Sequence, residues 1–188
     1  ATVADMVSLM EANRTLLSFG LEKIKKTTRL GLLALFKQGG IEKENIGVYE
    51  IGRIIAPRLN AAGRVASAMD SLRLICTRDR FKAESLALSL GETNKERQLL
   101  TAEMSFHAIS LFEKAKQNIL FAASKDYNQG VVGLIASRLV EKYYRPSIAV
   151  SIGEDVSKGS ARSVRGVNII EFIRLHSEFL VNAGGHPM

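Results

Sequence analysis

The sequence has no tryptophan, one cysteine and no apolar run as long as the roughly 20 residues that a membrane-spanning helix needs. A single cysteine, Cys76, excludes an internal disulfide and any metal site built from several cysteines, which predicts a reducing compartment. No basic segment followed by an apolar one opens the chain, so there is no sign of a secretory signal. We therefore expect a cytoplasmic protein without a membrane segment.

Aromatic residues are also scarce, at 6% of the chain, and they form no cluster typical of base stacking. Positive charge is in excess, since 26 Lys and Arg stand against 19 Asp and Glu, a formal net charge of +7. The excess lies in the centre: residues 51–100 hold nine Lys and Arg and five Asp and Glu, whereas residues 151–188 hold four of each. This pattern favours an anionic partner held through its phosphates, without reading of a base sequence.

With 188 residues, 46% of them hydrophobic, the chain can bury a core as one large domain or two small ones. It begins at Ala1 without a methionine and ends in Gly-Gly-His-Pro-Met, a turn-like sequence. From these two ends we expect a fragment of a longer protein.

The first part of the sequence predicts helices, because its apolar residues recur at helical spacing. Paired glycines at 39 and 40 are typical of a helix C-cap. Ahead of these helices, small and apolar residues around Asp5 are typical of a buried strand that ends near Leu9 and enters a turn. The helices are expected over residues 10–24, over 30–36, from about 48, and over 67–76.

A long helical region is predicted from Asp79, a typical N-cap residue, to Lys116. Gly91 is expected to break or kink it. The polar run 92–98 is expected to be solvated on most sides, so that this helix bridges two lobes and a domain boundary falls here.

After residue 117 the pattern changes to short apolar runs around one helix. Residues 118–123 and 147–152 predict buried strands, with a helix over 130–140 between them and a third strand ending near Ala161. Strand, helix and strand imply a parallel crossover, to which the third strand adds a hairpin. An amphipathic helix is expected over 169–180. The expected fold class is therefore α/β, with a helix-rich first part, a long bridging helix and a smaller α/β domain with a mixed sheet.

An arginine-rich segment, residues 52–64, reads Gly-Arg-Ile-Ile-Ala-Pro-Arg-Leu-Asn-Ala-Ala-Gly-Arg and contains no acidic residue. Pro57 disfavours helix in the residue before it and Gly63 permits a positive φ, so we expect a shaped loop between helices. Its arginines are candidates for binding phosphate, since guanidinium groups offer planar forks of donors. The alternative, commoner for an isolated segment, is that they are solvated or pair with carboxylates elsewhere in the fold.

Two further stretches are candidate anion sites. Residues 159–163, Gly-Ser-Ala-Arg-Ser, combine two hydroxyls and an arginine with small residues at the end of a strand. Residues 184–186, Gly-Gly-His, place an imidazole at a turn. Each is weak alone, because Ser and Arg are ordinary at a strand end and a lone histidine is usually a surface or capping residue.

Taken in order, several stretches together closely resemble the RecJ family of single-strand-specific DNA exonucleases, in the DHH phosphoesterase superfamily. The resemblance covers essentially the whole chain. It implies the end of a DHH catalytic domain over residues 1–90, a bridging helix over 91–117, and a DHH-associated nucleic-acid-binding domain, truncated at its carboxyl end, over 118–188. The stretches that carry it are residues 1–9 with Asp5, 55–64, 94–101, 130–138, 159–163 and 184–187.

The resemblance also implies roles for single residues. Asp5 matches a metal-ligating, catalytic aspartate of the family, although a lone Asp at a strand end is otherwise better explained as a cap or turn residue. Ser160 and Arg162 match residues associated with the terminal phosphate of the DNA. The expected nucleic-acid-binding residues are Arg58, Asn60, Arg64, Ser160, Arg162, Ser163, Gly184, Gly185 and His186.

Two departures from the family pattern limit what this chain can do alone. Asn128 stands, within Tyr-Asn-Gln-Gly, where the family usually has an aromatic residue followed by His-Pro-Gly. The motifs that supply most metal ligands, including Asp-His-His, are absent. We therefore expect at most one catalytic metal ligand, much of the substrate groove, and no activity from this chain by itself.

The resemblance implies part of a metal-dependent 5′-to-3′ exonuclease that hydrolyses single-stranded DNA in repair and recombination, with two Mn²⁺ or Mg²⁺ ions as cofactors. Single-stranded DNA is the expected partner, a single-strand-binding protein or a helicase are further candidates, and a monomer is expected. Two alternatives stay open. One is an oligonucleotide or cyclic-dinucleotide phosphodiesterase of the same superfamily, and the other is a non-catalytic module that binds single-stranded nucleic acid.

Overall fold

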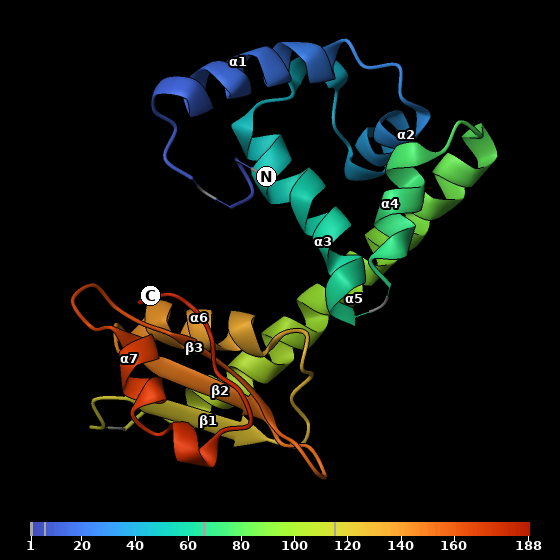
Figure 1. The fold of residues 1–188 in the computed structure, drawn as a ribbon. Coiled ribbons are helices and arrows are strands. Elements are labelled where there is room, and N and C mark those ends of the chain that lie inside the picture. The colour runs from blue at the N-terminus through green and yellow to red at the C-terminus, as the bar shows by residue number, and fades with distance from the viewer. Residues whose placement is uncertain (1, 6, 66, 115) are drawn as a thin grey trace. The chain divides into compact units, whose positions relative to one another are not determined.

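The computed structural model describes residues 2–5, 7–65, 67–114 and 116–188 (Figure 1). They form two compact units, residues 1–97 and 98–188, with the boundary inside a long helix. The first unit is helical, and the second is built around a small sheet. This arrangement confirms the expected fold class, while the domain limits expected at residues 90 and 117 stay predictions.

The helices predicted in the first unit over residues 10–24, 30–36 and 67–76 are confirmed to within a few residues. α2 ends at the expected glycine pair, because Gly40 adopts the left-handed conformation at φ 66° and caps the helix. The elements are α1 (Glu11–Lys25), α2 (Leu30–Gly39), η1 (Lys43–Asn45), η2 (Glu50–Ile55), α3 (Ala56–Val65), α4 (Met69–Cys76) and the start of α5 (Arg80–Ser110).

The core of the first unit joins α2, α4 and α5. Leu35, Leu74 and Leu90, one from each helix, are at most 1% exposed. Burying a leucine contributes roughly 1.5–3 kcal/mol, so these contacts hold the three helices together. α2 and α4 also approach closely, since a Cβ on Gly31 would overlap the carbonyl of Leu74.

Residues 52–64 are helical, so the predicted loop is wrong. η2 is a π-type helix that ends with a bond from the N–H of Ala56 to the carbonyl of Ile51, and α3 follows without interruption. Pro57 follows directly after the wide π-type turn of η2, where the regular helical bonding is already altered. Gly63 does not use the positive φ that glycine permits. The segment therefore presents its arginines from a helix.

The strand predicted before the first helix is also wrong. Residues 2–5 form a turn, closed by a 3.2 Å bond from the N–H of Val7 to the carbonyl of Thr2, and residues 7–10 have no regular structure. Ala1 and Met6, which that prediction includes, lie outside the described residues. A strand needs another strand to satisfy its backbone groups, and the described part of the first unit contains none.

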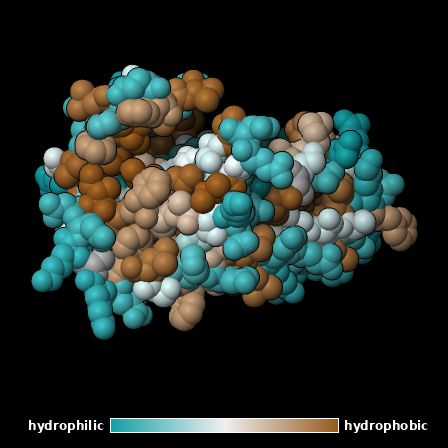
Figure 2. All heavy atoms as spheres, turned by 90° about the horizontal axis from the view of Figure 1, so that it is seen from below, coloured by the Kyte–Doolittle hydropathy of each residue, from teal (hydrophilic) through white to brown (hydrophobic). Residues whose placement is uncertain are grey.

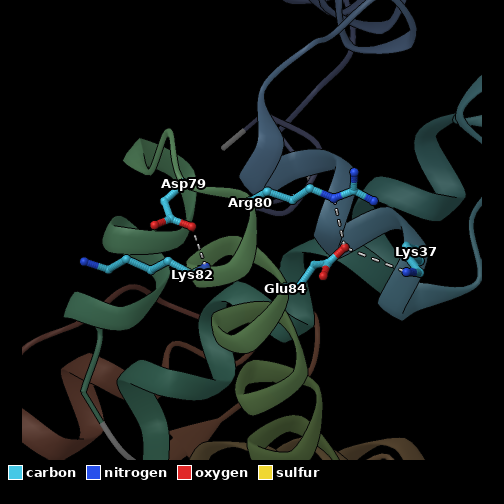
Figure 3. A network of polar contacts seen from close by, with 5 residues as sticks. All are labelled: Lys37, Asp79, Arg80, Lys82 and Glu84. Atoms are coloured by element: carbon cyan, nitrogen blue, oxygen red, sulfur yellow. Dashed lines mark hydrogen bonds and ion pairs between the residues drawn. The ribbon is translucent and has the colours of Figure 1, made fainter.

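α5 begins where the sequence predicts. Oδ1 of Asp79 accepts the N–H of Lys82 at 3.0 Å, which is an N-cap bond (Figure 3). Beside this cap, Glu84 lies 3.5 Å from Nε of Arg80 and 3.8 Å from Nζ of Lys37 in α2. These ion pairs are exposed and contribute little, so packing rather than charge holds α2 against α5.

α5 does not break at Gly91, contrary to the prediction, and it ends at Ser110 rather than near Lys116. Gly91 is buried, and a Cβ there would overlap the side-chain amide of Gln38 in α2. The glycine therefore serves close packing between helices, and α5 continues through it.

The second unit confirms the predicted crossover and hairpin. β1 pairs with β2 in parallel, β2 pairs with β3 in antiparallel, and the strand order is β1-β2-β3. Its elements are the end of α5, β1 (Leu120–Ser124), α6 (Val132–Tyr143), β2 (Ser147–Ser151), β3 (Lys158–Arg162), α7 (Ile169–Arg174) and η3 (Ser177–Phe179).

α6 covers one face of this sheet. The register aligns Ala122, Ala149 and Ser160 across the three strands, so these residues share a face. Ala122 and Ala149 are fully buried in a core that also holds Ile135 and Leu139 of α6. The strand face toward α6 therefore carries both the core and the side chains of β3 discussed below.

The helix predicted over residues 169–180 is shorter than expected, because α7 ends at Arg174 and η3 follows it. Phe179 and Val181 are 80% and 89% exposed, so this stretch has no continuous inward face. Apolar side chains reach the surface elsewhere too, and they lie among polar ones on the face shown in Figure 2. Within the described residues, no helix combines the length and the apolar character needed to cross a bilayer.

Candidate nucleic-acid interface

Arg58 lies half-buried in α3, and two uncharged acceptors hold its guanidinium group. Nε donates to Oε1 of Gln38 at 2.6 Å, and Nη1 donates to the carbonyl of Ile54 at 2.9 Å. Burial lowers the pKa of Arg58 from its ordinary value, although an arginine keeps its charge at physiological pH. Amide and carbonyl oxygens fix the fork without neutralising it, so Arg58 retains a full charge to offer an anion.

Arg64 of α3 and Arg97 of α5 bring two positive charges near each other within the first unit. Burial lowers the pKa of Arg97, and the positive charge of Arg64 lowers it further. Asn94, only 3% exposed, accepts Nε and Nη2 of Arg97 at 3.2 and 3.1 Å. Two neighbouring like charges repel each other, and an anion between them would offset that repulsion.

The sequence interpretation missed Arg97 and Gln38. Residues 92–98 are mostly exposed, as predicted, but Asn94 is buried and Arg97 is half-buried on the remaining side. The spacing of Asn94 and Arg97 puts both on one helix face, which is a signal that could have found the pair. Gln38 has no such signal, since it meets Arg58 only through the packing of α2 on α3.

Asn60 and Asp5, also predicted in the first unit, are exposed. The turn that carries Asp5 lies against η2, since Cγ1 of Val3 is 3.4 Å from where a Cβ on Gly52 would be. Among residues 2–5, 7–65, 67–114 and 116–188, no group of three or more His, Cys, Asp or Glu could hold a metal ion. Asp5 therefore cannot form a two-metal site with the residues described, and the donor set of this chain does not fit a complete one.

In the second unit, Ser160 and Arg162 lie on the side of β3 that faces α6. Nη1 of Arg162 donates to Oγ of Ser160 at 3.2 Å and to the carbonyl of Ala161 at 2.7 Å. A Cβ on Gly133, in the first turn of α6, would lie 3.2 Å from Oγ of Ser160 and 3.3 Å from Nη2 of Arg162. A helix start, a hydroxyl and a guanidinium group therefore meet, and both the helix dipole and the arginine favour an anion.

Gly133 is a further site residue, which the sequence analysis does not name among its candidates. The turn before it is fixed by Asn128, whose Oδ1 accepts the N–H of Gly130 at 2.8 Å. The N–H of Asn128 also lies 3.3 Å from Sδ of Met104 in α5. An asparagine suits this turn-capping task, which needs an acceptor two residues before the bonded N–H.

Ser163 joins β3 to the last residues of the chain. Its hydroxyl donates to the carbonyl of Val167 at 2.7 Å, and its N–H donates to the carbonyl of Met188 at 2.8 Å. The N–H of Ile169 donates to the carbonyl of Pro187 at 3.1 Å. The structure therefore brings the end of the chain beside Ser163, although the Ser163 hydroxyl is engaged internally.

The backbone bonds of Pro187 and Met188 also fix the place of the three predicted residues before them, Gly184, Gly185 and His186. Gly184 and His186 are exposed, and Gly185 has φ of 150°, a conformation that favours glycine. They directly precede Pro187 and Met188, whose carbonyls are bonded to the loop after β3. His186 is thus tethered to the segment that follows Arg162.

The positive charge is unequal between the units. The first unit holds 16 Lys and Arg against 11 Asp and Glu, whereas the second holds 10 against eight. The first unit therefore carries most of the electrostatic attraction for a polyanion.

Comparisons with known proteins point to one family. Residues 116–188 match the model of the DHHA1 domain. The single-stranded-DNA-specific exonuclease RecJ of Bacillus subtilis is 40% identical over the whole chain, which covers 24% of that protein. The RecJ of Haemophilus influenzae is 35% identical, again over the whole chain, which covers 35% of it. The chain thus spans about a quarter to a third of the length of these curated relatives.

Solved structures agree with the sequence matches. The crystal structure of RecJ from Thermus thermophilus in complex with Mg²⁺ superposes with a TM-score of 0.89 at 31% identity, covering 99% of this chain and 29% of that one. A crystal structure of exonuclease RecJ bound to manganese gives a TM-score of 0.83 at 32% identity, covering 99% of this chain and 46% of that one. The similarity therefore includes both units.

Proposed function

Because the chain is homologous to part of RecJ, including the DHHA1 domain, we propose that it is part of a RecJ-like exonuclease that degrades single-stranded DNA from the 5′ end. The observation that carries this proposal is the similarity to RecJ over the whole chain, and the nearby positive charges of Arg64 and Arg97 support it. A phosphate between them would relieve their repulsion. Arg58, with its charge intact, would add a second phosphate contact.

The first unit would hold internal phosphates of the strand. Arginines bound to backbone or amide oxygens contact phosphates without reading bases, and this chain lacks clusters of aromatic residues for stacking. Binding would therefore be independent of sequence and sensitive to salt.

The second unit would bind the terminal 5′ phosphate. Ser160, Arg162 and the start of α6 at Gly133 supply donors of three kinds at one place. A terminal phosphomonoester carries more charge than an internal diester and has more free oxygens, so it would satisfy these donors better. His186, tethered beside Ser163, would line the same path.

Catalysis by the complete enzyme would need Mn²⁺ or Mg²⁺, the ions bound in the homologous structures. Such cations activate a water molecule and neutralise the charge of the attacked phosphate. Asp5 would supply one carboxylate, and the other ligands would come from outside this chain. The residues of this chain would bind and orient the strand.

A cyclic-dinucleotide phosphodiesterase is the less favoured function. A closed dinucleotide has no terminal phosphate, so it would leave the donors of Arg162 and Ser160 without their best ligand. A non-catalytic binding module would keep the phosphate contacts but release no nucleotides. Single-strand-binding protein, helicase partners and the monomeric state stay predictions.

The test uses an enzyme that contains this chain, Mn²⁺, and single-stranded DNA labelled at the 5′ end. We expect Arg64→Ala and Arg97→Ala each to weaken DNA binding about tenfold and to lower the salt slope by about one phosphate contact. Arg73→Ala is the matched control, because it removes one arginine that is already paired with Asp70 at 2.9 Å. Equal effects of all three substitutions, or no release of nucleotides by wild type, would argue against the proposal.

A further inference from the structure

We propose that Gln38 is a positioning residue for DNA binding, which holds the guanidinium group of Arg58 toward the strand, and that Gly91 gives Gln38 the room to do so. This inference rests on the proposed function of Arg58. It concerns residues of α2 and α5 that the sequence does not connect with phosphate binding.

The bond between Gln38 and Arg58 is short and directional. Oε1 of Gln38 accepts Nε of Arg58 at 2.6 Å, while Nη1 of Arg58 donates to the carbonyl of Ile54 at 2.9 Å. Two bonds from different sides of a planar fork fix its plane as well as its place. These two bonds use Nε and Nη1, so Nη2 is the group of Arg58 that we assign to phosphate binding.

Gln38 suits this task better than a carboxylate would. An Asp or Glu in its place would cancel the charge of Arg58 and weaken its attraction for a phosphate. The amide oxygen accepts the same bond and leaves the charge of the arginine intact. Glu84 of α5 does contact α2, and its partner there is Lys37, with Oε1 of Glu84 3.8 Å from Nζ of Lys37 (Figure 3).

Gly91 determines where the amide of Gln38 can lie. A Cβ on Gly91 would overlap Nε2 and Cδ of Gln38. Any other residue at position 91 would therefore push the amide away from α5 and out of line with Arg58. The glycine costs α5 some helix propensity, on the order of 1 kcal/mol relative to alanine, although α5 continues through it.

The three residues thus form a chain of contacts across α5, α2 and α3. Gly91 admits the amide of Gln38, the amide orients the guanidinium of Arg58, and the guanidinium would then bind the phosphate. Substitution of Gly91 or Gln38 should leave Arg58 charged but free to sample other rotamers. An arginine that is not held in one orientation loses more entropy on binding a phosphate.

The first measurement follows Arg58 without any DNA. In the chain labelled with ¹⁵N, we expect the Nε–H signal of Arg58 to exchange slowly with solvent in wild type and to become fast-exchanging in Gln38→Ala and Gly91→Ala. Gln38→Glu keeps an acceptor and should keep the slow signal. Gln117→Ala, which truncates an exposed glutamine of the second unit, is the matched control. An unchanged signal in Gln38→Ala would overturn the inference.

The second measurement is a double-mutant cycle on binding of single-stranded oligodeoxythymidine. Gln38→Ala should weaken binding by about two- to 150-fold, the range of coupling within one hydrogen-bond network, and should add nothing in an Arg58→Ala background. Gly91→Ala should behave alike. Because Gln38→Ala removes the overlap, the double variant Gln38→Ala/Gly91→Ala should fold even if Gly91→Ala alone does not.

The outcomes distinguish the positioning role of Gln38 from the role of Arg58 in the proposed function. If Arg58→Ala weakens binding and Gln38→Ala does not, Gln38 has no positioning role and the proposed function stands. If Gln38→Ala weakens binding equally with and without Arg58, the residue acts on stability or on another group, which also overturns the inference. If Arg58→Ala itself leaves binding unchanged, the role of Arg58 in the proposed function fails and the positioning role falls with it.

Discussion

Gly133 approaches Ser160 so closely that a Cβ on the glycine would lie 3.2 Å from the serine Oγ. The same Cβ would lie 3.3 Å from Nη2 of Arg162, the tip of a flexible side chain. A methyl group at position 133 is therefore accommodated by small movements of the Ser160 hydroxyl and of Arg162. A substitution at Gly133 should therefore affect the position of the Arg162 side chain more than the stability of the fold.

We accordingly expect Gly133→Ala to separate stability from function. Alanine in a helix is favoured over glycine by roughly 0.5–1 kcal/mol, so the free energy of unfolding should stay the same or rise. Displacement of Arg162 should at the same time reduce the preference of the enzyme for a 5′ phosphate. Chemical denaturation and cleavage of 5′-phosphorylated against 5′-hydroxyl DNA measure the two effects. A loss of stability without a change in preference would contradict the expectation.

Arg162→Ala should remove the preference for a 5′ phosphate altogether. Loss of one charged partner from such a bond typically costs about 1.5–3 kcal/mol, on the order of ten- to a hundredfold in binding. Strands that end in a 5′ hydroxyl should be affected far less. Binding of both kinds of strand to wild type and variant checks this, and Arg138→Ala, which removes an arginine paired with Glu141 at 2.8 Å, is the control. If wild type and variant discriminate equally between the two kinds of strand, Arg162 does not recognise the 5′ phosphate.

The chain by itself should not hydrolyse single-stranded DNA in the presence of manganese. Two-metal chemistry needs several carboxylate or imidazole ligands, and Asp5 is without such a group in the described part of the chain. In a complete enzyme, Asp5→Ala should abolish turnover while strand binding persists, because the arginines still hold phosphates. Asp5→Asn separates the loss of charge from the loss of the side chain. Degradation of DNA by the purified chain that depends on Asp5 would refute this prediction.

The buried hydroxyl of Tyr127 predicts a dependence of stability on alkaline pH. It lies 2.9 Å from Nδ1 of His107, and burial raises the pKa of Tyr127 from its ordinary value. A raised pKa means that the folded state prefers the protonated phenol. Its contribution is therefore complete below about pH 10, the ordinary pKa of tyrosine, and is lost as pH rises through the folded-state pKa.

Tyr127→Phe should lower the free energy of unfolding at neutral pH by about 0.5–1.5 kcal/mol, the usual net contribution of one hydrogen bond. The difference between wild type and variant should shrink as the pH rises above about 10. Urea unfolding at a series of pH values measures it. A difference that stays constant, or grows, at alkaline pH would show that the phenol is not protonated preferentially in the fold.

The second unit follows closely from its sequence, because its signals are local. Short apolar runs around a glycine-rich helix start predict β1, α6 and β2, and a right-handed crossover is nearly the only way to connect them. The hairpin to β3 follows from the turn at residues 153–155. Little tertiary information is needed for these elements, so their order and pairing could be predicted.

The first unit shows where the sequence is insufficient. Pro57 and Gly63 favour a loop by their local preferences, but the wide turn of η2 accommodates the proline and packing of α3 keeps the glycine helical. Gly91 is a helix breaker by propensity and a packing residue in the fold. In each case a tertiary contact outweighs a local preference.

Some residues of the candidate site could be predicted from local sequence and others could not. Arg58 and Arg64 could be found from their basic segment, since the chemistry of a phosphate ligand is visible in composition. Arg97 and Gln38 could not, because their roles depend on contacts between α2, α3 and α5. Supporting residues are recognised only when the groups that they orient are known in three dimensions.

The register of the mixed sheet has a consequence for the order in which it forms. The antiparallel pairing joins Ser151 to Lys158, whereas the parallel pairing joins Leu120 to Ser147 across the whole of α6. Closing a longer loop costs more entropy, so the hairpin of β2 and β3 should form early and β1 should dock late. Substitutions in the hairpin should then slow folding, while those in β1 should mainly speed unfolding, which φ-value measurements can distinguish. The strand that carries Ser160 and Arg162 would thus be among the first parts of the second unit to acquire its native pairing.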